Sequence, residues 1–84
     1  MTLKQALAAA ADLVEAGWAQ GTNNLPGVCI VQALVRADPS LNTIVASQNR
    51  VREVIGETDL VAWNDTYGRT QAEVVMVLRK AARL

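Results

Sequence analysis

Residues 2–18 read TLKQALAAAADLVEAGW, and this stretch sets the fold class of the 84-residue chain. Thr2 and Gln5 have the spacing of a capping box, in which a hydroxyl and an amide satisfy free backbone N–H groups at a helix start. At about 100° per residue, the apolar side chains of the stretch fall on one face and the charged ones on the other. We therefore predict an amphipathic helix over about residues 3–16, ended by Gly17.

Residues 20–27 are dense in turn formers and predict a loop. Beyond it, capping and turn signals delimit four more helical stretches, over about residues 28–37, 39–55, 60–63 and 70–83. The first of these is apolar on almost every side, so we expect it to be the central and most buried helix. Its β-branched residues also permit a strand, but no second strand pattern exists to pair with it. The prediction is an all-α, compact, four- to five-helix single domain over residues 1–84.

Composition bears on the partners of such a domain. Eight basic and eight acidic side chains give a formal net charge of zero. Nucleic-acid binders usually carry a basic excess, because neutralised phosphates supply most of their affinity. The hydrophobic fraction of 51% is high for so short a chain and favours self-association. We therefore expect a homo-oligomer and no nucleic-acid partner.

Three features bear on the location of the protein. Cys29 is the only cysteine, and a lone, buried thiol suits a reducing cytoplasm. Asp12 ends the apolar stretch near the N-terminus before it could serve as a signal peptide. The turn formers in residues 20–27 interrupt the uncharged segment that could otherwise have crossed a membrane. We expect a cytoplasmic protein that does not bind membranes.

The sequence offers no chemistry for catalysis. It contains no histidine, no glycine-rich phosphate loop and no serine in a nucleophile-elbow context. Its carboxylates are scattered, and ligand clusters for a metal are missing. We predict that the protein is not an enzyme, with no catalytic, cofactor-binding or metal-binding residues and no cofactor.

One candidate site lies between the last two helical stretches. Trp63, Asn64, Asp65 and Arg69 bring together an aromatic face, an amide, a carboxylate and a guanidinium, which could hold a small polar ligand or the backbone of a partner. The alternative is structural. Trp63 would then fill the core, the two polar residues after it would cap a helix end or form an Asx-turn, and Arg69 would pair with Asp65.

A second set of candidates could form an interface. Gln48 lies in the middle of the predicted apolar face of the helix over residues 39–55, so its amide either bonds internally or pairs across a self-association seam, and Arg52 could join either arrangement. Met76 lies on the polar side of the last helix, near Arg79 and Arg83. It is either an ordinary exposed side chain or an anchor for an acidic, apolar partner surface.

Four stretches of the chain together carry a family resemblance. They are GWAQG at residues 17–21, CIVQAL at 29–34, WND at 63–65 and GRTQAEV at 68–74. In this order they resemble a family of small proteins of unknown function from actinobacteria and their phages. The resemblance implies a fold and an origin, and no catalytic residues. The shortness of the chain suggests a phage version that acts on the host as an accessory protein.

Three functions follow as hypotheses. The leading one is a small non-enzymatic, phage-type accessory protein that acts by protein–protein interaction with a host or phage protein and self-associates. The alternative is a protein that sequesters a small ligand, such as a nucleotide signal, at Trp63 and its neighbours. The third is a helix-turn-helix DNA binder with Thr43, Ser47, Asn49 and Arg50 on an exposed face, which the spacing of the turn before that helix disfavours.

Overall fold

The computed structural model describes residues 1–21 and 26–84. Within these ranges the chain forms five helices: α1 (Leu3–Ala16), α2 (Ile30–Ala37), α3 (Leu41–Ile55), α4 (Leu60–Asn64) and α5 (Gln71–Arg83). The described residues contain no strand, only an isolated parallel bridge between Trp18 and Val28. The predicted all-α fold with four to five helices in one small domain is confirmed. The predicted loop over residues 20–27 includes residues 22–25, which lie outside the described residues.

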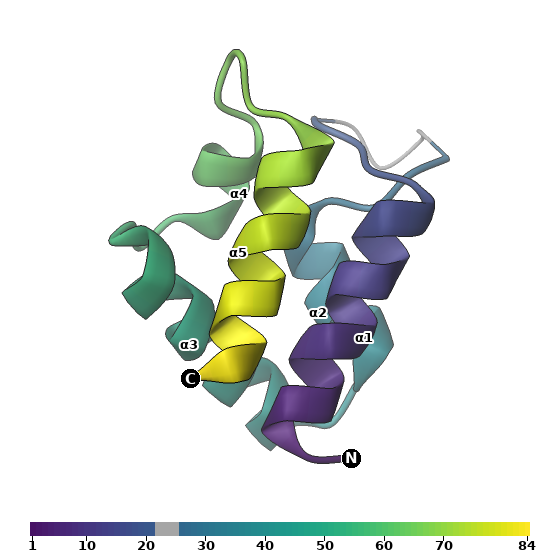
Figure 1. The fold of residues 1–84 in the computed structure, drawn as a ribbon, viewed down its shortest axis with the longest axis vertical. Coiled ribbons are helices and arrows are strands. Elements are labelled where there is room, and N and C mark those ends of the chain that lie inside the picture. Colours follow the sequence, from purple (N-terminus) through teal and green to yellow (C-terminus); the bar gives the residue numbers. More distant parts are fainter. Residues whose placement is uncertain (22–25) are drawn as a thin grey trace.

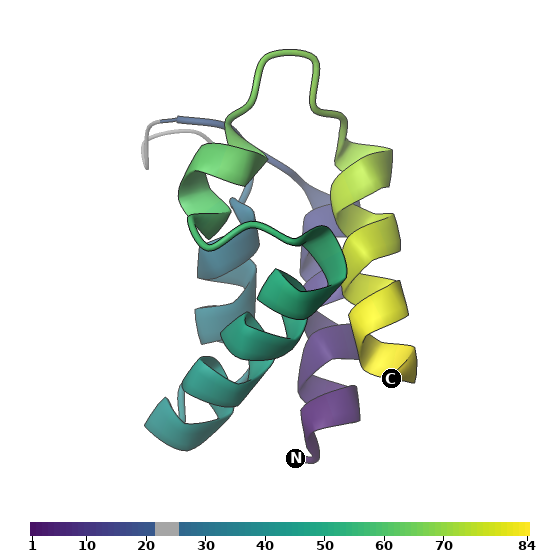
Figure 2. The same cartoon turned by 90° about the vertical axis from the view of Figure 1, so that its left-hand side faces the viewer.

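Helix α1 is the centre of the fold. It runs antiparallel to α5 (Figure 1), and it also packs against α2 and α3. Figure 2 shows α3 crossing the domain below α4, with α1 and α5 behind and to one side. The prediction that the second helix would be central is wrong, because α1 holds that position and Val35 of α2 is exposed. The alanines of α1 explain the difference, since small side chains let other helices approach closely on more than one side.

The helix starts follow the capping residues in the sequence. Thr2 and Gln5 form the predicted capping box of α1, and Thr70 and Glu73 form that of α5. Asp59 caps α4, where its carboxylate accepts the N–H of Ala62. These local signals were correctly predicted because a cap is satisfied within three residues and needs no tertiary partner.

Two predicted boundaries shift by two residues. Helix α2 begins at Ile30, and Cys29 is its half-buried N-cap, whose thiol accepts the N–H of Gln32. Helix α3 begins at Leu41, and Asp38 ends α2 instead of capping α3. The Asp38 carboxylate accepts the N–H of Ser40, so it orders the turn between the two helices.

The buried face of α3 also differs from the prediction. Ser47 and Val51 are its buried residues, whereas Leu41 is 73% exposed and Gln48 lies at the margin of the core. The Ser47 hydroxyl can be buried because it donates to the Ile44 carbonyl of its own helix. The observed buried face is thus rotated about the helix axis from the predicted one. The sequence did not indicate this rotation, because a serine is normally expected on the surface.

The same rotation contradicts the face proposed for reading DNA. Ser47 is buried, and Arg50 reaches across to the carbonyls of Ala81 and Leu84 at the end of α5. Two of the four side chains expected on an exposed recognition face are therefore committed inside the fold. None of the described helices combines the length and apolar character needed to span a membrane.

Candidate functional site

Asn64 is the centre of a buried polar cluster that joins three separate segments. Its side chain is fully buried, and its Oδ1 accepts both the indole N–H of Trp18 at 2.8 Å and the N–H of Ile30 at 3.0 Å. Its Nδ2 donates to the Ala19 carbonyl at 3.1 Å and to Asp65 Oδ1 at 2.9 Å. We call these five residues the Asn64 hub. One amide thereby ties the end of α4 to the segment after α1 and to the first turn of α2.

A close backbone approach supports the hub. The N–H of Val28 donates to the Gly17 carbonyl at 3.0 Å, and the N–H of Ala19 donates to the Val28 carbonyl at 3.1 Å. A Cβ on Gly27 would collide with the carbonyl group of Trp18. Only glycine fits at this position, because any side chain would push apart the two backbone segments, after α1 and before α2, that Asn64 joins.

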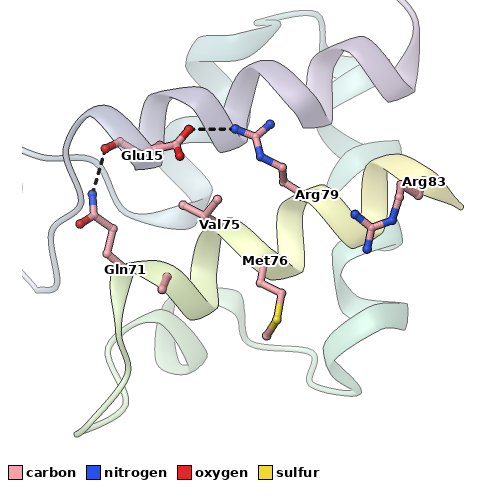
Figure 3. A pocket seen from close by; sticks show the side chains of 7 residues that line it. Glu15, Gln71, Val75, Met76, Arg79 and Arg83 are labelled. Atoms are coloured by element: carbon pink, nitrogen blue, oxygen red, sulfur yellow. Dashed lines mark hydrogen bonds and ion pairs between the residues drawn. The ribbon is translucent and has the colours of Figure 1, made fainter.

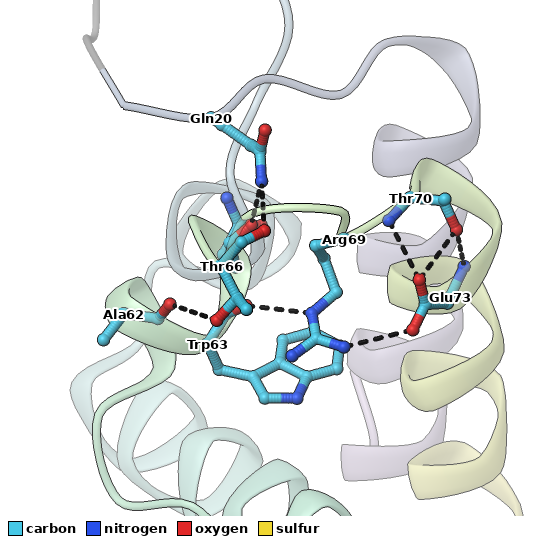
Figure 4. Close-up of polar contacts among 8 residues, drawn as sticks. Gln20, Ala62, Trp63, Thr66, Arg69, Thr70 and Glu73 are labelled. Atoms are coloured by element: carbon cyan, nitrogen blue, oxygen red, sulfur yellow. Dashed lines mark hydrogen bonds and ion pairs between the residues drawn. The ribbon is translucent and has the colours of Figure 1, made fainter.

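Trp63 and Arg69 form a second contact beside the hub (Figure 4). The Arg69 guanidinium lies over the Trp63 ring, 4.0 Å from its centroid, while its Nε donates to the Trp63 carbonyl at 2.9 Å. Its Nη1 pairs with Glu73 at 3.1 Å. The predicted pair between Arg69 and Asp65 is not formed, because the guanidinium turns towards α5 and Asp65 accepts the N–H of Gly21.

The position of Glu73 affects its titration. The pKa of its carboxyl is lowered from the ordinary value of 4.5, first by the hydrogen bond from Arg69 and then by the bonds from the backbone and hydroxyl of Thr70. The carboxylate thus joins the loop after α4 to the first turn of α5, where a negative charge is also favoured by the helix dipole.

These contacts bear on the proposed recognition loop. The structure does bring Trp63, Asn64, Asp65 and Arg69 together, as the sequence suggested. However, the Asn64 amide uses both oxygen lone pairs and both N–H groups inside the fold, and the Arg69 guanidinium is covered on one face by an indole. The geometry is that of a structural joint and adds no support for a ligand site here.

An open groove lies elsewhere, between α1 and α5 (Figure 3). It has a volume of about 410 Å³ and is formed by Glu15 of α1 and six residues of α5: Gln71, Ala72, Val75, Met76, Arg79 and Arg83. We call it the α1–α5 groove. Met76 points away from α1 and is 61% exposed. The groove therefore presents a flexible apolar side chain to whatever approaches it.

Two polar side chains of the groove, Gln71 and Arg79, are held by contacts with α1. Gln71 Nε2 donates to the carbonyl of Val14 at 2.7 Å and to that of Glu15 at 3.2 Å, so it closes the end of α1. Arg79 Nη2 pairs with Asp12 at 2.8 Å and with Glu15 at 3.0 Å. The hydrogen bond to Asp12 is the main reason that the pKa of the Arg79 guanidinium is raised.

Of the four predicted interface residues, the structure places two in this groove and two elsewhere. Met76 and Arg79 line it, whereas Gln48 and Arg52 lie on α3. Arg52 Nε donates to the Thr58 carbonyl at 2.8 Å, and its guanidinium also reaches Gln48 at 3.5 Å. The hydrogen bond between Arg52 and Thr58 orders the turn after α3. Gln48 is thus not at the centre of an apolar face.

The sequence did not identify Glu15 and Gln71 as groove residues. Their contact joins positions more than fifty residues apart, so no local pattern could reveal it. Four of the five remaining groove residues did carry a signal, because Ala72, Met76, Arg79 and Arg83 recur at the spacing of one helix face. Among the residues that the structure describes, no group of three or more acidic or cysteine side chains could hold a metal.

The fold and these two sites define a small all-α domain that is stapled by one buried amide and carries an open groove on its outer face. The chain belongs to the family of unknown function DUF6197, whose sequence model matches residues 1–84. Comparison with curated proteins and with solved structures gave no match.

Proposed function

We propose that this domain acts by binding protein chains through the α1–α5 groove. The observation that carries the proposal is Met76, an exposed methionine in a groove between two packed helices. Methionine adapts its shape to different apolar surfaces, and methionine and arginine are enriched at protein interfaces. Ala72 and Val75 extend the apolar floor beside it.

The charges around the groove support the same role. Arg79, Glu15 and Gln71 are held in place by contacts within the chain, so binding would cost them little conformational entropy. The Arg83 side chain makes no hydrogen bond or ion pair within residues 1–21 and 26–84, so its guanidinium remains available to a partner. A partner surface with an apolar side chain for Met76 and a carboxylate for Arg83 would be complementary to the groove.

The wider setting is part of the proposal. We infer a non-enzymatic accessory role in the cytoplasm of an actinobacterial cell, in a protein of actinobacterial or phage origin whose partner is a host or phage protein. The support is the family resemblance of the four sequence stretches and the balanced charge of the chain.

Photo-crosslinking tests this function. A photoreactive amino acid replaces Met76, and in a control it replaces Val61, an exposed side chain of α4 outside the groove. We expect position 76 to give covalent adducts of discrete mass in cells that carry the protein, and position 61 to give none of them. The adducts should disappear when Ala72→Arg fills the groove. The proposal fails if both positions give the same adducts, or if position 76 gives none.

A further inference from the structure

We propose that the α1–α5 groove binds a second copy of this chain, across a two-fold axis that places the two α5 helices antiparallel. This inference rests on the proposed function and names its partner. It depends on three features of the groove: the spacing of its side chains, the distribution of its charges and the shape of its two ends.

The spacing is that of a seam between two helices. Ala72, Met76, Arg79 and Arg83 stand at i, i+4, i+7 and i+11, the alternation of four and three that keeps one face of a helix against a partner helix. All four line the groove, on the outer side of α5. The described helices pack against the other faces of α5, so this seam is the face that they leave open.

The charges are complementary to themselves. Asp12, Glu15 and Arg79 form one cluster of two carboxylates and one guanidinium, with a formal charge of −1. The Glu15 backbone lies beside Gln71, at the start of α5, and its carboxylate reaches along α5 to Arg79, whereas the Arg83 side chain, unpaired among the described residues, is at the end of α5. A two-fold axis repeats the same contact twice, so the Glu15 carboxylate of each copy can meet Arg83 of the other.

The shapes of the two ends agree with this pairing. An axis at the level between residues 77 and 78 puts Arg83 opposite the second copy's Ala72, and Met76 opposite the second copy's Arg79. The methyl group of Ala72 leaves room for the arginine stem, whose guanidinium can then reach Glu15 of the other copy. The Glu15 carboxylate is 66% exposed and engages Arg79 through Oε2, so its other oxygen is available.

The apolar side chains and the ion pairs of the seam contribute differently. An exposed ion pair adds little affinity by itself, so we expect the charges to set the orientation and the apolar contacts of Ala72 and Met76 to supply most of the affinity. Helix α5 is only about 20 Å long, which is short for a standard interface. The dimer should therefore dissociate on dilution.

Sedimentation equilibrium of the full chain tests the dimer. Between about 1 µM and about 1 mM, the range in which a weak dimer dissociates, we expect the mass to rise from that of one chain towards that of two. Arg83→Glu should raise the dissociation constant at least about tenfold, whereas Arg83→Lys, which keeps the positive charge, should change it by no more than about threefold. Circular dichroism confirms that each variant is folded. Leu41→Ser, on the exposed side of α3, serves as the matched control and should leave the constant unchanged.

The outcomes separate this inference from the proposed function. A single-chain mass at every concentration overturns the dimer, and so does an Arg83→Glu variant that associates as the wild type does or a loss of association in Leu41→Ser. If the chain is monomeric but position 76 still crosslinks to a different protein, the dimer falls and the proposed function stands. If position 76 gives no adduct either, both fall.

Discussion

The Asn64 hub and the α1–α5 groove both contain polar side chains, but they differ in how many of the polar groups have partners within the chain. In the hub, four hydrogen bonds use every donor and acceptor of a fully buried amide. In the groove, the Arg83 side chain makes no hydrogen bond or ion pair with the described residues, and Met76 is mostly exposed. A polar group that is saturated internally holds the fold together, whereas one that is left open can serve a partner.

The two regions also differ in how they relate to the sequence. The stretches GWAQG and WND meet in the hub, so the architecture explains why these residues stand where they do. The groove residues belong to α5 and the end of α1, and outside the helix spacing they form no motif. Sequence motifs therefore indicate the hub residues, whereas the groove residues are identified by the exposure of their side chains in the structure.

The largest effect should follow from Asn64→Ala. The substitution leaves the buried Ile30 N–H without a partner, at about 1–3 kcal/mol, and also removes the partly buried bonds to the Trp18 indole N–H and the Ala19 carbonyl. A domain of this size has only about 3–5 kcal/mol of stability. We expect the variant to be largely unfolded by far-UV circular dichroism, whereas Asn42→Ala, at an exposed position of α3, should keep the wild-type urea midpoint. An unchanged midpoint in Asn64→Ala would show that the hub does not hold the fold together.

A smaller but clear effect should follow from Gly27→Ala. The added methyl group meets the Trp18 carbonyl, and relief requires the two backbone segments to separate, at about 1–3 kcal/mol. Gly17→Ala is the matched control, because Gly17 has an extended backbone with only ordinary contacts around its Cβ position. It should lose nothing and could gain up to about 1 kcal/mol. Urea titration distinguishes the two, and equal midpoints would contradict the close approach at Gly27.

In the groove, Met76→Ser should change the free energy of unfolding by no more than about 0.5 kcal/mol, because the side chain is exposed and makes no polar contact. The same variant should weaken self-association, which separates binding from folding. A large loss of stability would place Met76 in the core of the domain and remove the contrast with the hub. Thermal unfolding and sedimentation of the same preparation provide both measurements.

The sequence predicted the local features of this fold well and the long-range features poorly. The capping boxes at Thr2 and Thr70 and the boundaries of α1 were correct, because a cap or an amphipathic period is complete within a few residues. The central position of α1 and the rotation of α3 were missed. Both depend on which small side chains, such as Ser47, other helices cover, and a single helix does not contain that information.

The same division applies to the candidate sites. Met76 and Arg79 could be identified from one helix, and the structure places them in the groove. The grouping of Trp63, Asn64, Asp65 and Arg69 was also visible, but the role of Asn64 depends on Trp18 and Ile30, which lie far away in the sequence. Whether an amide is open or saturated is decided by such distant partners.

The smallest effect should be the pH dependence of stability contributed by Glu73, which pairs with Arg69 beside the hub. Its folded-state pKa is lowered below 4.5 by Arg69 and Thr70, so the unfolded chain takes up this proton more readily than the folded one. The stability that it contributes is therefore complete above the unfolded pKa and is lost as the pH falls through the folded pKa.

Glu73→Gln isolates this contribution. A glutamine can still cap α5, as Gln5 does in α1, but it cannot titrate. Urea midpoints measured across the acid range should fall less steeply with decreasing pH in the variant than in the wild type, while the two should converge at low pH, where the wild-type carboxyl is protonated. Parallel curves would mean that Arg69 binds the carboxylate no better than water does, so Arg69 would be held by its stacking on Trp63 and its hydrogen bond to the Trp63 carbonyl and would not join the loop to α5.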